Sequence, residues 1–139
     1  RMAVYTIKVS LAVKDGANTL VLTPTYCEID LDAGKASRIL WVLDDGGSDA
    51  HFQLKRGLMF GWLDMPAKGI FGDADVDAGK RIIAIQDNHL GKGRFGSWRY
   101  SLSVKKGTEV YKLPVDSSGP HETSPDGTDR GKTPIIINR

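Results

Sequence analysis

The sequence predicts an all-β fold, a single antiparallel β-sandwich, from two observations. Within the segment 96–104, large apolar side chains at Trp98, Tyr100, Leu102 and Val104 alternate strictly with polar ones, which places one face of a strand in the core and the other in water. Roughly eight or nine short segments with strand-like patterns follow one another along the chain, separated by turns rich in Gly, Asp and Asn. No stretch has the period of an amphipathic helix.

The strands can be placed in order along the chain. Residues 4–11 are rich in β-branched side chains, 20–22 form a short strand before Pro24, and 38–43 are the most hydrophobic and therefore central. The other predicted strands cover residues 26–31, 51–54, 58–62, 81–86, 96–104, 109–113 and 134–138. The predicted core side chains are Ile7, Val9, Leu11, Ile29, Leu31, Ile39, Trp41, Leu43, Phe52, Leu54, Ile83, Ile85, Trp98, Tyr100, Leu102 and Val104.

The chain is expected to form one domain over residues 1–139, with a mobile loop at 114–132. This loop has turn-forming residues and almost no large apolar side chain, and it is longer than most ordered connections. The apolar residues 134–138 that follow it are expected to return to the body and pair there.

Composition excludes several classes of protein. A net charge of +2 is too small to indicate nucleic-acid or membrane binding, and no apolar run approaches the roughly 18 residues of a membrane span. Cys27 is the only cysteine, so no intrachain disulfide forms. No signal peptide is visible, and we expect a cytoplasmic protein without a cofactor.

Part of the chain resembles the cupredoxin family. The matching segments are residues 27–34, 39–41 and 49–52. In copper-binding members a histidine near His51 is a ligand, together with a cysteine, a second histidine and often a methionine late in the chain. Here the late strand at 100–103 has no cysteine, and Cys27 comes far too early. The resemblance implies an Ig-like or cupredoxin-like sandwich without the copper ligand set.

A second resemblance is to small, mostly uncharacterised bacterial β-sandwich proteins of the DP-EP-like kind. Their late strand reads Gly-x-Trp-x-Tyr-x-x-x-Val, and they end in Asp-Pro-x-Ile-x-Asn. The matching residues here are Gly96, Trp98, Tyr100, Val104, Pro134, Ile136 and Asn138. Thr133 stands where that motif has Asp. The resemblance implies a fold and no activity.

The aspartates at 73, 75 and 77 are candidate metal ligands. Asp73, Asp75 and Asp77 resemble the opening of a calcium loop, since hard oxygen ligands at alternate positions suit Ca²⁺. Ala78 stands where such a loop needs Gly, and Ala84 where it needs Glu. The alternative is a strand edge with three solvated carboxylates.

The remaining candidates are a thiol, two histidines and a tryptophan. Cys27 alternates with apolar neighbours, which favours a buried side chain over a nucleophile. His51 and His89 are candidate ligand-binding residues, and His89 falls in a polar loop. Trp62 lies where the chain leaves a strand, so it is the tryptophan expected to be exposed and available for a sugar or a partner.

No convergent catalytic set is visible, so the sequence favours a non-catalytic binding or assembly module. Its partner would be an unidentified protein or a second copy of the chain, joined through exposed strand edges. Two alternatives stay open. One is a small-molecule or carbohydrate binder that uses exposed aromatic side chains, and the other is a divalent-metal-binding protein.

Overall fold

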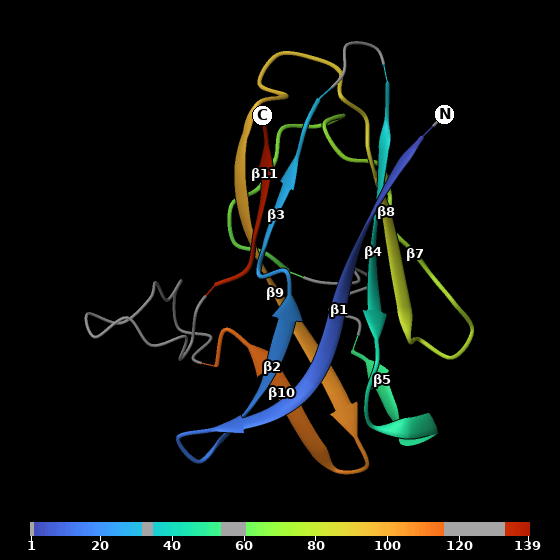
Figure 1. Ribbon diagram of the computed structural model, residues 1–139, viewed down its shortest axis with the longest axis vertical. Coiled ribbons are helices and arrows are strands. Elements are labelled where there is room, and N and C mark those ends of the chain that lie inside the picture. The colour runs from blue at the N-terminus through green and yellow to red at the C-terminus, as the bar shows by residue number, and fades with distance from the viewer. Residues whose placement is uncertain (1, 32–34, 54–60, 116–132) are drawn as a thin grey trace.

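The computed structural model describes residues 2–31, 35–53, 61–115 and 133–139, which form two packed β-sheets (Figure 1). The first sheet has the strand order β2-β1-β4-β8-β7. Its strands are β1 (Ala3–Lys14), β2 (Ala17–Thr23), β4 (Ser37–Leu43), β7 (Asp75–Val76) and β8 (Ile82–Asp87). A short 3-10 turn, η1 (Gly47–Asp49), leads from this sheet to the second one.

The second sheet is built around the long strand β9 (Gly96–Lys106). Four of its strands lie in the order β10-β9-β11-β3. In addition, β5 and β6 pair with β9. These strands are β3 (Tyr26–Ile29), β5 (Ala50–Phe52), β6 (Gly61–Trp62), β10 (Glu109–Leu113) and β11 (Ile135–Asn138).

The predicted all-β sandwich is confirmed, but its two sheets are mixed rather than purely antiparallel. β1 runs parallel to β4, and β3 runs parallel to β11. In both pairs the intervening chain passes through other strands before it returns, and such a long crossover is what a parallel pair requires. Alternation along one strand reports its buried face and says nothing about the direction of its neighbour.

The alternating residues meet between the sheets and form one core. Trp41, Tyr100 and Phe52 are the largest fully buried side chains. Among the predicted core positions Leu11 and Leu31 are only partly buried, and Leu54 lies outside the described residues. Trp41 Nε1 donates a hydrogen bond of 2.9 Å to the hydroxyl oxygen of Tyr100, which satisfies the one polar atom of the indole in the dry interior.

The predicted return of the C-terminal segment is confirmed. β11 pairs antiparallel with β9, where Ile136 lies opposite Trp98. The predicted loop at 114–132 lies outside the described residues from position 116 onward, and the predicted strand at 58–62 is described only at 61–62.

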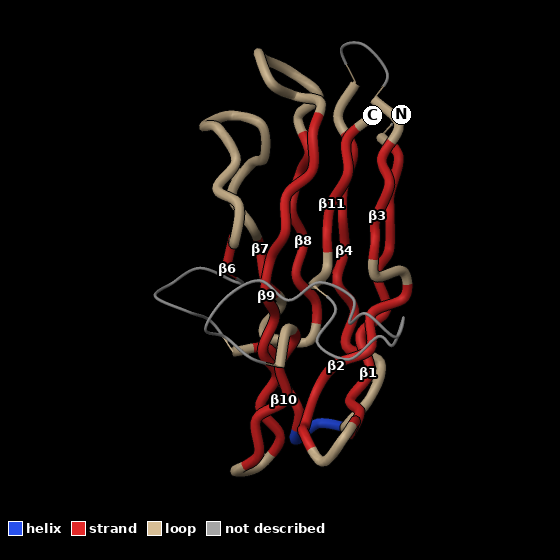
Figure 2. The backbone as a smooth tube through the Cα atoms, turned by 90° about the vertical axis from the view of Figure 1, so that its left-hand side faces the viewer, coloured by secondary structure: helices blue, strands red, loops and turns tan. Residues whose placement is uncertain are grey.

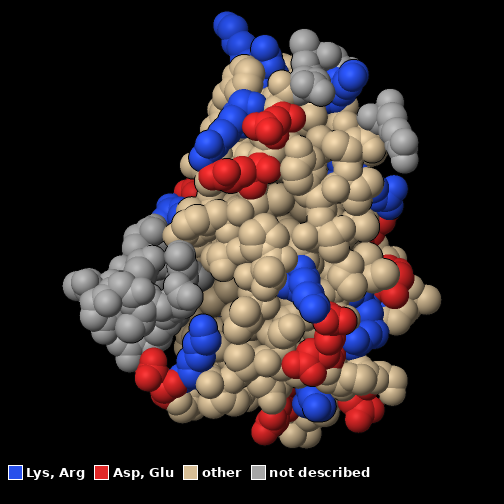
Figure 3. Space-filling view, viewed as in Figure 1, with Lys and Arg blue, Asp and Glu red and all other residues tan. Residues whose placement is uncertain are grey.

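The long strands run along the longest dimension of the molecule (Figure 2). Basic and acidic side chains are interspersed on the face shown in Figure 3, in keeping with the small net charge. Within the described residues, no helix has the length and apolar character needed to cross a membrane.

Candidate functional site

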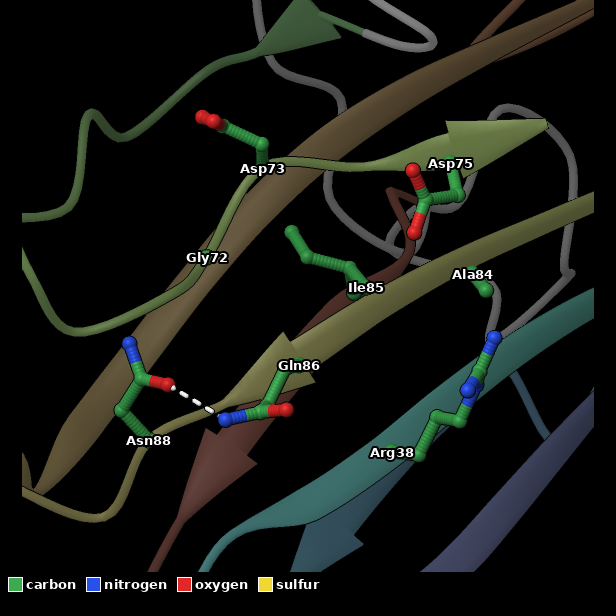
Figure 4. A pocket seen from close by; sticks show the side chains of 8 residues that line it. All are labelled: Arg38, Gly72, Asp73, Asp75, Ala84, Ile85, Gln86 and Asn88. Atoms are coloured by element: carbon green, nitrogen blue, oxygen red, sulfur yellow. Dashed lines mark hydrogen bonds between the residues drawn. The ribbon is translucent and has the colours of Figure 1, made fainter.

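A polar hollow lies on the outer face of the first sheet, over β4, β7 and β8 (Figure 4). The strand register explains its position. Arg38 of β4 pairs with Gln86 of β8, and Asp75 of β7 pairs with Ala84 of β8. Paired residues point to the same face, so these side chains all stand on the outside of the sheet. The hollow has a volume of about 250 Å³.

Two small residues leave the space open. Ala84 lies between the longer side chains of Arg38 and Asp75, and Gly72 lines the side formed by the chain just before β7 (Figure 4). A Cβ atom added to Gly72 would lie 3.7 Å from Cβ of Gln86, an ordinary contact distance. The backbone at Gly72 therefore has room for a Cβ atom, which glycine lacks.

The charged side chains of the hollow have no partners within the described residues. Arg38 extends toward Ala84 and Asp75 stands on the other side of Ala84, whereas the side chain of Asp73 points away from the other lining residues (Figure 4). None of the three makes a hydrogen bond or an ion pair in that part of the chain. The exposed charges Lys8 and Asp44 of the same sheet, by contrast, pair at 3.0 Å.

The far end of the hollow is held by an amide pair. Gln86 Nε2 donates a hydrogen bond of 2.9 Å to Oδ1 of Asn88, and Asn88 Nδ2 donates one of 2.9 Å to the carbonyl oxygen of Gly69. These bonds fix both amides, and the side-chain carbonyl oxygen of Gln86 remains as an acceptor. A fixed acceptor beside charges of both signs can bind a ligand's N–H or O–H group.

A second polar group lies behind the hollow, on the inner face of the same two strands. Ser37 and Asp87 are paired across β4 and β8, each one position from Arg38 and Gln86. Successive side chains of a strand point to opposite faces, so the two groups stand back to back. Ser37 is 1% exposed and Asp87 is fully buried.

His89 and Asn138 complete this inner group. A hydrogen bond of 2.9 Å joins Ser37 Oγ and His89 Nε2. Asn138 Nδ2 donates to Asp87 Oδ1 at 3.2 Å and to the carbonyl oxygen of Arg94 at 2.9 Å. Burial raises the pKa of Asp87 above the ordinary value for a carboxyl group. The group ties the C-terminal strand to the first sheet.

Serine, histidine and aspartate meet here without forming a catalytic triad. A triad needs the carboxylate on His Nδ1, whereas Nδ1 of His89 has no hydrogen-bond partner among the described residues. Ser37 and His89 are both buried, so a substrate has no access to them. Cys27 is buried too, and burial raises the pKa of its thiol to about 11, which keeps it protonated at neutral pH.

The three predicted ligand residues lie on separate elements. His51 is half-buried on β5 opposite Lys105, and His89 is buried in the loop after β8 although its neighbours are polar. Trp62 on β6 is half-buried, and Phe71 stacks on its ring with centroids 5.1 Å apart. Phe71 therefore covers part of the ring surface that a sugar would use.

The three predicted metal ligands are exposed but do not share a role. Asp73 and Asp75 line the hollow. Oδ1 of Asp77 accepts the backbone N–H groups of Arg81 and Ile82 at 2.7 and 2.9 Å, which closes the turn into β8 and lowers the pKa of its carboxyl group. In the described part of the chain, no three His, Cys, Asp or Glu side chains gather as a metal-binding group. Calcium binding stays a prediction, which a calcium titration tests.

Sequence reasoning missed most of the hollow. It identified Asp73 and Asp75 for their spacing, but not Arg38 on β4, Gln86 on β8 or Asn88 just after β8. The predicted core positions Ile39, Trp41 and Leu43 do place Arg38 on the outer face, because successive side chains of a strand point to opposite faces. Nothing in the sequence indicates that the segment around Asp75 pairs beside β8 and brings its charges there.

In comparisons with known proteins, the chain matches no family model, and no curated protein and no solved structure is similar to it. The geometry of the described residues therefore carries the functional argument.

Proposed function

We propose that the protein is a non-catalytic binding module that holds a small zwitterionic ligand, such as an amino acid or a short peptide end, in the hollow. One observation carries the proposal. Arg38 and Asp75 bring charges of opposite sign to one hollow, and neither side chain is paired within the described residues. A ligand with an anionic and a cationic group would pair with both signs at once.

Each polar side chain that lines the hollow can bind a different group of the ligand. The guanidinium of Arg38 can grip a carboxylate through two parallel hydrogen bonds. Asp75 would accept an ammonium group, and the carbonyl oxygen of Gln86 an additional N–H or O–H. A volume of about 250 Å³ is below the range of roughly 300–1,000 Å³ common for drug-sized ligands, so the ligand is small.

The burial of the nucleophile candidates supports a role without catalysis. Cys27, Ser37 and His89 lie on the inner side of the sheets, where a ligand on the outer face cannot reach them. The proposal keeps the cytoplasm as the compartment, because the single cysteine is a free thiol.

Isothermal titration calorimetry with a panel of amino acids and dipeptides tests the proposal, with organic acids and simple amines that carry only one charge as comparison ligands. We expect zwitterions to bind, and both R38M and D75N to weaken binding by roughly 10- to 100-fold, the loss of one charge-assisted pair. K8M is the matched control, because Lys8 is an outward basic residue of the same sheet outside the hollow. No binding across the panel, or equal loss in K8M, would overturn the proposal.

A variant that fills the hollow gives an independent check. Gly72→Val places a side chain where the backbone has room for a Cβ atom, so the fold should persist while the cavity shrinks. We expect G72V to retain the melting temperature of the wild type within a few degrees and to lose ligand binding. Unchanged binding in G72V would place the ligand elsewhere.

A further inference from the structure

Within the described residues, the first half of β1 is an unpaired edge of the first sheet. β1 pairs with β4 over Ala3 to Val9 and with β2 from Lys8 onward, so residues 3–7 have a described neighbour on one side only. β3 contacts β1 and lies on the same lateral side of the molecule (Figure 2), but no described strand pairing joins them. An open edge of this kind is able to accept another strand.

The free backbone groups belong to Val4 and Thr6. The carbonyl oxygen of Val9 accepts the N–H of Asp44, just beyond β4, so odd-numbered residues of β1 direct their backbone groups toward β4. Backbone groups alternate between the two edges of a strand, so those of Val4 and Thr6 point away from β4. Among the described residues no backbone group bonds to them.

The side chains on this edge are uncharged, and apart from the hydroxyl-bearing Tyr5 and Thr6 they are apolar. Met2 is 44% exposed and Val4 is 56% exposed, and residues 2–7 carry no charge. Exposed edges are commonly protected by a lysine, a proline or a bulge. Residues 2–7 contain neither lysine nor proline. The edges of β2 and β10 are protected by each other, since Thr19 Oγ1 donates to the carbonyl oxygen of Lys112 at 3.0 Å.

We propose that this edge binds the same edge of a second copy of the chain. An antiparallel pair centred on Tyr5 sets Val4 opposite Thr6 of the partner and Thr6 opposite Val4. Each of these pairs exchanges two N–H···O bonds, so four bonds form around a twofold axis. The absence of charge over residues 2–7 lets identical edges meet without like-charge repulsion. Two first sheets then join into one continuous sheet across the dimer.

Sedimentation velocity from micromolar to millimolar concentration tests the proposal. We expect the mass to rise from 15.2 kDa toward twice that value, and V4K to raise the dissociation constant at least roughly tenfold. V13K is the matched control, because Val13 is an exposed valine of the same strand that lies opposite Asn18 of β2, outside the edge at residues 3–7. Thr6→Pro removes an N–H without a partner in the monomer, so it should keep the fold and abolish dimers.

Amide hydrogen exchange identifies the edge that pairs. The N–H groups of Val4 and Thr6 should exchange more slowly in the dimer than in the monomer, and those of β3 should not change. A monomer at millimolar concentration, a dimer unaffected by V4K and T6P, equal loss in V13K, or protection elsewhere would each overturn the proposal. Failure of ligand binding in the hollow would leave these readouts unchanged, because the dimer forms through backbone groups on the edge of β1, whereas the hollow is lined by side chains on the outer face over β4, β7 and β8.

Discussion

Replacing Tyr100 by Phe removes one buried oxygen and leaves the aromatic ring. The hydroxyl of Tyr100 accepts the indole N–H of Trp41 at 2.9 Å, and both side chains are fully buried. The edge-to-face contact of the two rings, with centroids 5.5 Å apart, is retained. The variant therefore measures the loss of the hydrogen-bond acceptor in the core.

Leaving a buried donor without its acceptor costs about 1–3 kcal/mol. The unfolding entropy of a 139-residue chain is about 0.3 kcal/mol/K, so the melting temperature should fall by roughly 3–10 °C. Differential scanning calorimetry measures this fall. Tyr5→Phe is the control, because the Tyr5 hydroxyl makes no hydrogen bond within the described residues. Equal melting temperatures for Y100F and Y5F would refute the reasoning.

Three further predictions concern titratable groups. Because burial raises the pKa of Asp87, its stabilising contribution is complete below the ordinary value of 3.8 and is lost as pH rises. At neutral pH, urea unfolding should therefore show D87N to be more stable than the wild type, and this difference should disappear at low pH. A difference that is the same at all pH values would contradict this. Arg99 holds the pKa of Asp64 at about 2, so the stability that D64N loses should be present above pH 3.8 and vanish as pH falls toward 2. The unfolding free energy that D64N loses is at most about 1 kcal/mol, since the side chains of Asp64 and Arg99 are both about a third exposed. If D64N were still less stable than the wild type at pH 2, the ion pair would not be the cause. Cys27 should react with a thiol reagent only at the rate of unfolding, and fast reaction of the native protein would exclude its burial.

Most of the fold could be predicted from the period-two alternation of side chains in the strands. The outward and inward positions of β9 follow directly from its alternating side chains, and Trp98 and Tyr100 are buried as that pattern requires. The parallel pairing of β1 with β4 could not be predicted in the same way, because a strand has the same period whichever way its neighbour runs. His89 shows a related limit. Its loop is polar, yet hydrogen bonding to Ser37 holds it inside.

The hollow depends on register, which periodicity does not contain. Residues 38 and 86 are far apart in the chain, and only their pairing across β4 and β8 sets their side chains side by side. The short strand at Asp75 then adds acidic groups on the same face. A pattern of alternating aspartates in the sequence indicates a solvated edge or a cation site. In our proposal Asp75 instead forms one side of a site for a zwitterion, because Arg38 stands on the same face of the sheet.

Two-dimensional ¹H–¹⁵N NMR during titration with an amino acid tests the central claim most directly, because it locates the ligand as well as detecting it. The account predicts that shifts concentrate on the backbone and side-chain amides of Gly72, Asp75, Gln86 and Asn88, that they saturate, and that they are absent in R38M and retained in K8M. Saturating shifts that cluster away from β4, β7 and β8, around Trp62 or His51 for example, would contradict it, as would a spectrum unchanged by every zwitterion of the panel.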